Sequence, residues 1–182
     1  MASPSVVASQ LCNGKGYLFM QDVKDTFFVA LRDRVASGNP ARTVVVRGVV
    51  RPGVMVEENE LATEWIPTGV FSVRWRDVAV DRSGDVPLAA LGCSIRYGTD
   101  GDAAHGGMDR GRLLAQMDAE LGLALGAGVR NVPKMSFASG AAVALGTQVF
   151  WGDVAFGAAV VAGERLERVA TVTVFGYLEA GS

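Results

Sequence analysis

Residues 71 to 76 alternate strictly between apolar and polar side chains. The apolar positions are Phe71, Val73 and Trp75, and the polar positions between them are Ser72, Arg74 and Arg76. Successive side chains of a β-strand point to opposite faces, so this pattern predicts a strand with one face in the core and one basic face turned to solvent or to a partner. A second alternation follows the turn at 81–87 and predicts a neighbouring antiparallel strand, with Leu91, Cys93, Ile95 and Tyr97 on one face.

Two other segments carry helical periodicity. In the first, apolar residues recur every three or four positions, at Val23, Phe27, Ala30, Leu31 and Val35. This spacing predicts an amphipathic helix from a cap at Asp22 to a break at 37–40. In the second, apolar residues stand four apart, at Leu113, Met117, Leu121 and Leu125. They predict a helix that begins near 108 or 109 and ends at Gly126.

Runs of β-branched and aromatic residues predict the remaining strands, within 43–57, 148–156 and 169–178, the last after a charged turn at 164–168. The first of these has two parts, 43–50 and 54–57, with Pro52-Gly53 between them. Gly48 and Pro52 interrupt it, so the two parts predict either a hairpin or a bent, bulged strand. The order of helix, strands, helix and strands predicts an α+β fold. We expect a largely antiparallel or mixed β-sheet with two amphipathic helices packed on one face.

Residues 1–20 and 126–147 lack a regular apolar pattern and are rich in small residues. We therefore expect an N-terminal arm over 1–20 and a single α+β domain over 21–182 that contains a long loop, 126–147. Segments of this kind often become ordered on a partner. We expect both to be mobile in the free subunit and ordered by neighbouring subunits.

Charge and length exclude several classes of protein. The chain has 182 residues, with 17 basic and 19 acidic side chains, so it has no excess of positive charge to neutralise phosphates in general nucleic-acid binding. The first residues lack the basic start and apolar core of a signal peptide, and no apolar run approaches the roughly 20 residues of a membrane span. Cys12 and Cys93 lack a CxxC spacing and are expected to be free thiols in a reducing compartment.

The chain offers few residues for catalysis, because His105 is its one histidine. His105 lies in a glycine-rich segment with Asp100, Asp102 and Asp109, which could be sketched as a metal or acid–base site. The spacing matches no calcium loop, since Ala103 and Ala104 stand where oxygen ligands would be needed. Asp and Gly belong at the start of a helix, so we interpret the segment as a solvated loop. The sequence predicts no catalytic, cofactor-binding or metal-binding residue.

Three further patterns have ordinary explanations. Gly126 and Gly128 follow a helix, whereas the glycines of a nucleotide site join a strand to a helix N-terminus. The segment 13–16 lacks the first glycine and the Ser or Thr of a phosphate-binding loop. A group of acidic residues could suggest the paired carboxylates of a glycosidase, but nothing distinguishes it from a solvated loop. Its members are Glu57, Glu58, Glu60 and Glu64.

The polar face of the predicted sheet and the tryptophans are candidates for interaction. Arg74, Arg76 and Arg96 would form a basic stripe on two adjacent strands, suited to phosphate, carboxylate or an acidic protein partner. The alternative is an exposed sheet face whose arginines pair with carboxylates of the same chain. The tryptophans are expected to be core or interface anchors, not platforms for stacked bases. They are Trp65, Trp75 and Trp151.

This order of elements resembles the tail terminator, or tail-completion, proteins of long-tailed bacteriophages and prophages. The resemblance rests on the helix 22–36 with Asn39 and Pro40 after it, the strands in 42–57, the strand 88–99 that runs into the helix 109–125, and the last strand, 169–178. It covers most of the chain by pattern and includes no invariant motif. The 20-residue arm and the segment 126–146 are additions to the simplest form of this order of elements.

The resemblance implies a structural virion protein without enzymatic activity. Such a protein forms a homo-oligomer, a hexameric ring that caps the tail tube protein, ends tube polymerisation and joins the tube to a neck or head-completion protein. A contractile tail would add the tail sheath as a partner, genomic DNA would only pass through the channel, and no membrane would be involved. The protein would be assembled in the host cytoplasm and reside in the virion.

Two alternatives stand beside this interpretation. A head–tail connector or minor tail protein would share the virion location. A small-molecule-binding or hydrolytic α+β enzyme, with 126–146 as a lid, belongs to a different class. A pocket with convergent polar groups would favour the enzyme, and a smooth central ring channel would exclude it.

Overall fold

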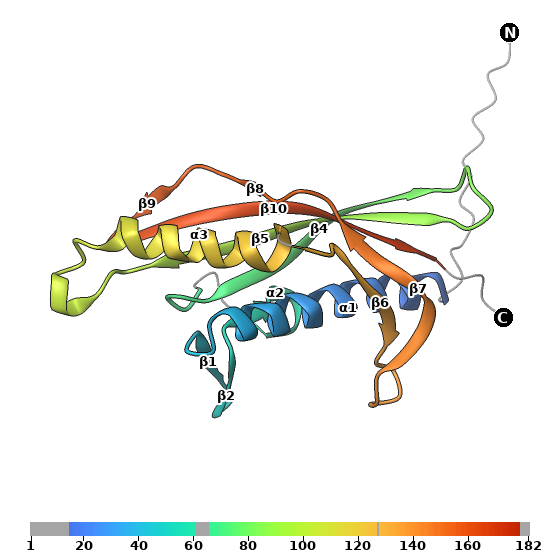
Figure 1. Ribbon diagram of the computed structural model, residues 1–182, viewed down its shortest axis with the longest axis horizontal. Helices are drawn as coiled ribbons and strands as arrows, with labels where there is room; N and C mark the ends of the chain where they lie inside the picture. Colours follow the sequence, from blue (N-terminus) through green and yellow to red (C-terminus); the bar gives the residue numbers. More distant parts are fainter. Residues whose placement is uncertain (1–14, 61–65, 127, 179–182) are drawn as a thin grey trace, which may run out of the picture.

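A computed structural model describes residues 15–60, 66–126 and 128–178 of the chain. It has an α+β fold dominated by its sheet (Figure 1). The main helices are α1 (Lys15–Gly38) and α3 (Arg110–Gly126), with a short α2 (Glu57–Glu60) and a 3-10 turn η1 (Ala103–His105). The strands are β1 (Thr43–Val46), β2 (Val49–Pro52), β3 (Val54–Val56), β4 (Phe71–Asp81), β5 (Leu88–Thr99), β6 (Asn131–Ser136), β7 (Val143–Trp151), β8 (Ala155–Phe156), β9 (Val160–Ala162) and β10 (Arg165–Tyr177).

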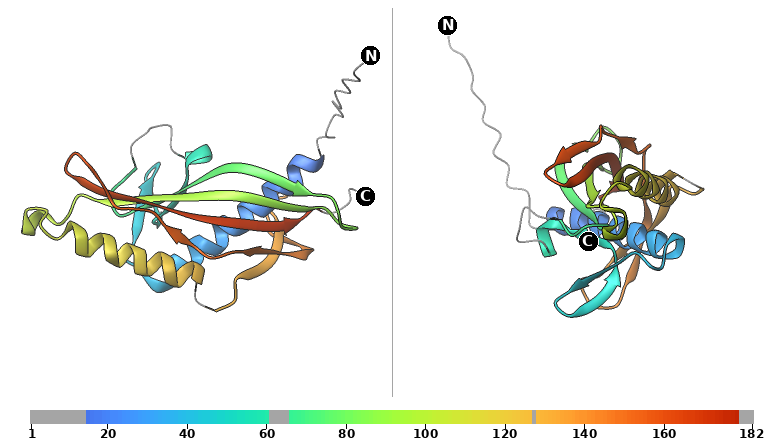
Figure 2. Two further views of the ribbon diagram at one scale, coloured as in Figure 1. Left: turned by 90° about the horizontal axis from the view of Figure 1, so that it is seen from above. Right: turned by 90° about the vertical axis from the view of Figure 1, so that its left-hand side faces the viewer.

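The sheet is mixed and mostly antiparallel, as the sequence predicts. Its strand order is β3-β4-β5-β10-β7-β6, and β8 and β9 also pair with β10. The pairing of β3 with β4 is parallel, and the others in this sheet are antiparallel. The three long strands β4, β5 and β10 run along the long axis of the molecule (Figures 1 and 2). They position the basic face and the strand edges described below.

The two long helices cover one face of these strands. Most of the predicted apolar positions of α1 and α3 are buried against alternate residues of β4, β5 and β10 in one core, whereas Ala30 and Leu113 are only partly buried. Phe27 of α1 lies at its centre, with edge-on contacts to Trp75 of β4 and Trp151 of β7 at ring-centroid distances of 5.8 and 5.5 Å. Trp75 and Trp151 are thus core anchors, as predicted, and Trp65 lies outside the described residues. The alternations at 71–76 and 91–97 correctly predicted which strand face is buried.

The first helix begins earlier than predicted. Residues from Lys15 onward belong to α1, so the expected arm over 1–20 is wrong for its last six residues, and residues 1–14 lie outside the described part of the chain. Asp22 lies inside the helix, where its carboxylate cannot cap the helix start. Leu18 and Met20 have high helix propensity, which lets the helix extend before the residue type that usually begins one.

The predicted long loop over 126–147 is also wrong. The segment contains β6 and the start of β7, which pair from Asn131↔Phe150 to Ser136↔Val143. Thr26 of α1 fixes the outer side of β6, since its Oγ1 accepts a hydrogen bond from the Met135 amide at 2.9 Å and donates one to the Met135 carbonyl at 3.1 Å. These contacts join residues 109 positions apart, so a local periodic pattern in the sequence cannot predict them.

Two strand boundaries also differ from the prediction. The first β-rich run folds into a hairpin, β1–β2, but its turn is Arg47-Gly48 and not the Pro52-Gly53 pair. Both turn residues have positive φ, 51° and 80°, as a two-residue type I′ turn requires. The predicted charged turn at 164–168 is instead largely strand, because β10 begins at Arg165. Arg165 is only 6% exposed and its charge is paired inside the fold.

Candidate interaction surfaces

The outer face of the long strands carries the predicted basic stripe. Ser72 is paired with Arg96, and Arg74 with Ser94, so Arg74 and Arg96 lie on the same face of neighbouring strands. A hollow of 510 Å³ on this face is lined by Arg74, Arg76, Arg96 and Ser94. The structure therefore confirms that the stripe exists on two adjacent strands.

Within the described residues, the carboxylate of Glu57 lies near this stripe. Glu57 of α2 accepts a hydrogen bond from the Ser72 hydroxyl at 3.1 Å, and its carboxylate lies 3.9 Å from Arg74 Nε. The Arg74 side chain still remains 66% exposed. Such a distant, solvated ion pair contributes little to stability, so pairing with Glu57 leaves the Arg74 charge available to a partner.

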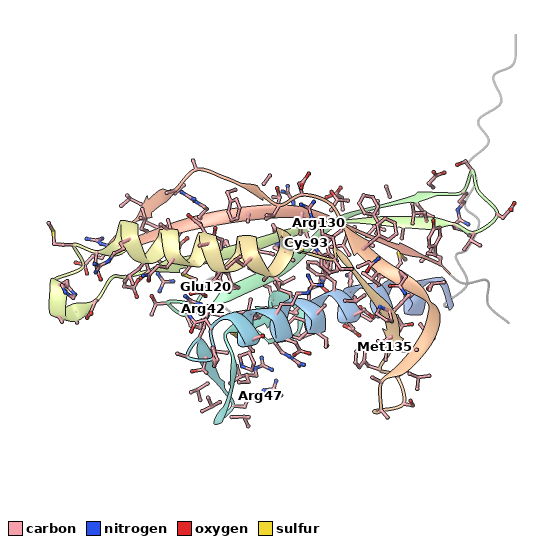
Figure 3. The ribbon with its side chains drawn as sticks, in the orientation of Figure 1. Arg42, Arg47, Cys93, Glu120, Arg130 and Met135 are labelled. Atoms are coloured by element: carbon pink, nitrogen blue, oxygen red, sulfur yellow. The ribbon has the colours of Figure 1, made fainter. Side chains whose placement is uncertain are left out.

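The β1–β2 hairpin is a second exposed surface, and it is apolar. Val45 and Val50 are a cross-strand pair, and both are about two-thirds exposed, as is Val49 near the tip. The opposite side of the hairpin is anchored, because Val44 and Val46 pack on a small cluster with Met55, Ile66 and Val70. Figure 3 shows Arg47 at the far end of this projecting hairpin.

A third exposed surface follows β7 in the chain. Residues 155–164 are all exposed, and none of residues 154–163 is charged. The segment includes β8 and β9, and its large apolar side chains are Phe156, Val160 and Val161. Phe156 reaches back to α3, where it lies near Gly122. Exposed apolar strand edges of this kind are uncommon in proteins that stay monomeric.

An ionic cluster holds the base of the hairpin to α3, and no pattern in the sequence indicates it. Arg42 donates from Nη2 to Glu120 Oε1 at 2.8 Å and from Nε to the other carboxylate oxygen. Asn39 donates to Glu120 as well, at 2.8 Å, and Arg42 also bonds the Gly69 carbonyl. Figure 3 shows Arg42 and Glu120 side by side. The partners are 78 residues apart, so only the fold brings them together.

The glycine-rich segment around His105 separates into two parts. Asp100 pairs with Arg165, whereas Asp102, His105 and Asp109 bring one ligand atom each to within 4.8 Å of one another. Within this cluster Asp102 caps η1 by accepting from the Ala104 amide, and Asp109 accepts from the Asp102 amide at 2.9 Å. Arg112 lies 3.5 Å from Asp109. The carboxylates thus have local structural roles at the start of a helix.

We expect His105→Ala and Asp102→Asn to leave both folding and assembly unchanged. The His105 and Asp102 side chains are at least half exposed, and Asn caps a helical turn about as well as Asp. Thermal unfolding and particle mass of the two variants would check this. A loss of assembly with a native circular dichroism spectrum, or a wild-type melting temperature that rises with added divalent cation and does not rise in His105→Ala, would contradict it.

Where the structure describes them, the cysteines, the acidic group and the glycines considered in the sequence have structural positions in the fold. Cys93 is buried in the core, and burial raises the pKa of its thiol to about 12, while Cys12 lies outside the described residues. Glu58 pairs with Lys24 at 3.5 Å, and Glu64 is not among the described residues. Gly126 ends α3, and Gly128 follows it with a φ of 74°. The acidic group and these glycines form no common site among the residues described.

Comparison with known proteins adds no family. No protein-family model matches the sequence, and no curated protein sequence matches it. One similar solved structure, whose name states no function, has a TM-score of 0.40 and 11% identity over 90% of this chain and 97% of its own. Another belongs to the virion of a native gene transfer agent particle, with a TM-score of 0.25 and 15% identity over 83% of this chain and 96% of that one. Similarities this distant carry no functional argument.

Within residues 15–60, 66–126 and 128–178, no helix combines the length and the apolar character that crossing a bilayer requires.

Proposed function

We propose that this protein is a structural component of a phage or phage-derived particle, and specifically a tail terminator. In this role it forms a homo-oligomeric ring, most simply a hexamer, on the end of the tail tube. The ring ends tube polymerisation and joins the tube to the neck or head-completion protein. The observation that carries the proposal is the amount of apolar strand surface that the folded subunit leaves exposed.

The exposed surfaces suit a ring subunit because they differ from one another. A closed ring uses heterologous contacts, in which one patch of a subunit meets a different patch of its neighbour. Here an apolar hairpin, an uncharged strand edge and a basic sheet face lie on separate parts of one fold. Two patches can hold neighbours in the ring, and the third remains for the tube or the neck protein.

The order of the elements supports the same assignment. The helix, strands, helix and strands on which the resemblance to tail terminators rests occur in the fold in that order, with α1, β4–β5, α3 and β10 as its main parts. In this role the protein would reside in the virion after assembly in the host cytoplasm. DNA would pass through the ring, and a contractile tail would add the sheath as a partner.

The mass and symmetry of the purified protein test this proposal. Light scattering and negative-stain imaging should show a ring of defined order, and the ring should bind the end of isolated tail tubes. A protein that stays monomeric at high concentration, alone and with tubes, would contradict the proposal. A ring that binds a neck or portal complex and ignores tubes would assign it to the connectors instead.

A further inference from the structure

The sheet has an open edge along β4. Its partner β3 pairs only with residues 71–73, and no strand of the described residues pairs with that side of β4 beyond Val73. The free length therefore runs from Arg74 to Asp81, interrupted by an irregularity between Trp75 and Val78. The backbone amides and carbonyls on its outer side, which do not face β5, are available to another strand.

A second open edge lies on the opposite side of the same sheet. In the described part of the chain, β8 and β9 pair with β10 alone, and the uncharged segment 154–163 that contains them forms the border. Natural proteins usually protect such edges with charge, proline or a covering element. None of the residues 154–163 is charged or proline. The edge is therefore suited to a partner strand.

The third border of the sheet, β6, is closed. Thr26 of α1 satisfies both the amide and the carbonyl of Met135, and Pro133 has no amide hydrogen to offer. Of the borders that lie alongside the long strands β4, β5 and β10, those of β4 and the β8–β9 segment thus remain open among the described residues.

We propose that these two edges pair with each other between copies, so that the free edge of β4 in one subunit adds antiparallel to the β8–β9 segment of the next. This proposal rests on the ring of the proposed function and specifies its subunit interface. β4 is antiparallel to β5, β5 to β10, and β10 to β8 and β9. β4 and β8–β9 therefore run in opposite directions. Rotation about a ring axis preserves strand direction along the axis, so the pairing between copies is antiparallel too.

Charge at the ends of the two edges agrees with this direction. The uncharged segment is flanked by Glu164 and by Asp153, which pairs with Arg130 of its own subunit but whose side chain remains 88% exposed. The free part of β4 is flanked by Arg74 at one end and Arg82 at the other. Antiparallel pairing brings Asp153 towards Arg82 and Glu164 towards Arg74. Opposite charges therefore meet at both ends of the paired strands, which favours the antiparallel direction.

The two carboxylates of the β4 edge are directed within their own subunit. The Asp77 carboxylate packs over Gly92 of β5, so close that a Cβ on Gly92 would approach its Oδ1 to 2.4 Å. Asp81 accepts a hydrogen bond from the Ser83 amide at 2.9 Å. The basic side chains at the ends of β4 therefore determine the charge that a neighbour meets.

The strand register also predicts the offset between neighbours. Arg74 is paired with Ser94, Ser94 with Thr171, and Thr171 with Ala155, so Arg74 and Ala155 lie at the same level of the sheet. From that level the free edge of β4 runs one way along the strands and β8–β9 runs the other way. Pairing them shifts each subunit by about seven residues, or roughly 23 Å, along the strands. A regular stagger of this kind tilts strands and closes sheets into cylinders.

Cross-linking locates the contact whatever the register of the two strands. We would replace Val161, which is 71% exposed, by p-benzoylphenylalanine, irradiate the assembled protein and identify the linked peptides by mass spectrometry. The expected product joins residue 161 to residues 74–82 of another copy. The same replacement at Val143, 52% exposed on β7, is the control and should give no link to 74–82. Intersubunit links from 161 that fall elsewhere would overturn the proposal.

A backbone variant tests the hydrogen bonds themselves. Ala162 and Arg165 close the β9–β10 turn, so the amide of Val161 points away from β10. Val161→Pro removes that donor, and we expect it to weaken assembly about tenfold or more per contact. Val161→Thr keeps the amide and should assemble like the wild type. A Val161→Pro ring of wild-type stability would overturn the edge pairing while leaving the ring intact. A wild-type protein without any oligomer would overturn the ring as well.

Discussion

Phe27→Ala is expected to lower the free energy of unfolding by about 3–5 kcal/mol, the usual cost of removing a buried phenylalanine ring. The Phe27 side chain is fully buried and is the point at which α1 contacts both Trp75 and Trp151. Truncation leaves a cavity between these rings and removes two edge-on aromatic contacts. Urea denaturation followed by tryptophan fluorescence would measure the loss directly, because both partners are tryptophans.

Phe28→Ala is the matched control for this prediction. Phe28 is the next residue of α1 and is only partly buried, at the border of the same core. We expect its truncation to cost clearly less than that of Phe27. Equal losses for the two variants would mean that α1 is not packed on the sheet through Phe27.

Arg165→Ala is expected to cost about 2–4 kcal/mol, because it leaves the groups around a buried guanidinium without their cation. Arg165 donates from Nε and Nη2 to the two carboxylate oxygens of Asp100, at 2.7 and 3.2 Å, and from Nη1 to the Ile66 carbonyl. These bonds hold the end of β5 and the chain before β4 against the start of β10. Asp100 is about half exposed, so water can replace part of its loss.

The same pair predicts a pH dependence with a defined sign. Its hydrogen bonds with the Arg165 guanidinium hold the pKa of Asp100 below its ordinary value. A carboxylate with a lowered pKa in the folded state contributes stability above its unfolded pKa, near 4, and loses it as the pH falls towards the folded pKa. Wild type should therefore lose more stability than Arg165→Ala on acidification below about pH 4. Parallel curves for wild type and Arg165→Ala would contradict this prediction.

Local periodicity predicted those parts of this fold that each segment encodes by itself. The alternations at 71–76 and 91–97 assigned the buried face of β4 and β5, and the four-residue spacing from Leu113 to Leu125 located α3. The same alternation placed Arg74 and Arg96 on one outer face, which is the part of the candidate surface that could be foreseen. These assignments succeeded because the burial of a position within one strand or helix determines whether its side chain is apolar or polar.

The parts that could not be predicted depend on partners distant in sequence. β6 is anchored by Thr26, 109 positions before Met135, and Arg42 contacts Glu120 across 78 positions. The Arg47-Gly48 turn has no asparagine or aspartate to indicate a type I′ geometry, so Pro52-Gly53 was the stronger local signal. The two open strand edges became visible only when the strand order was known, because an unpaired edge is a property of the sheet and not of a segment.

Tail length in lysates tests the proposed role most directly. The gene for this chain would be deleted from the genome that encodes it, and the particles that the strain releases would be examined by electron microscopy, with a plasmid copy as control. We predict tails of uncontrolled length alongside separate filled heads, restored to normal joined particles by the plasmid. Tails of normal length joined to heads in the deletion strain would contradict the proposed role.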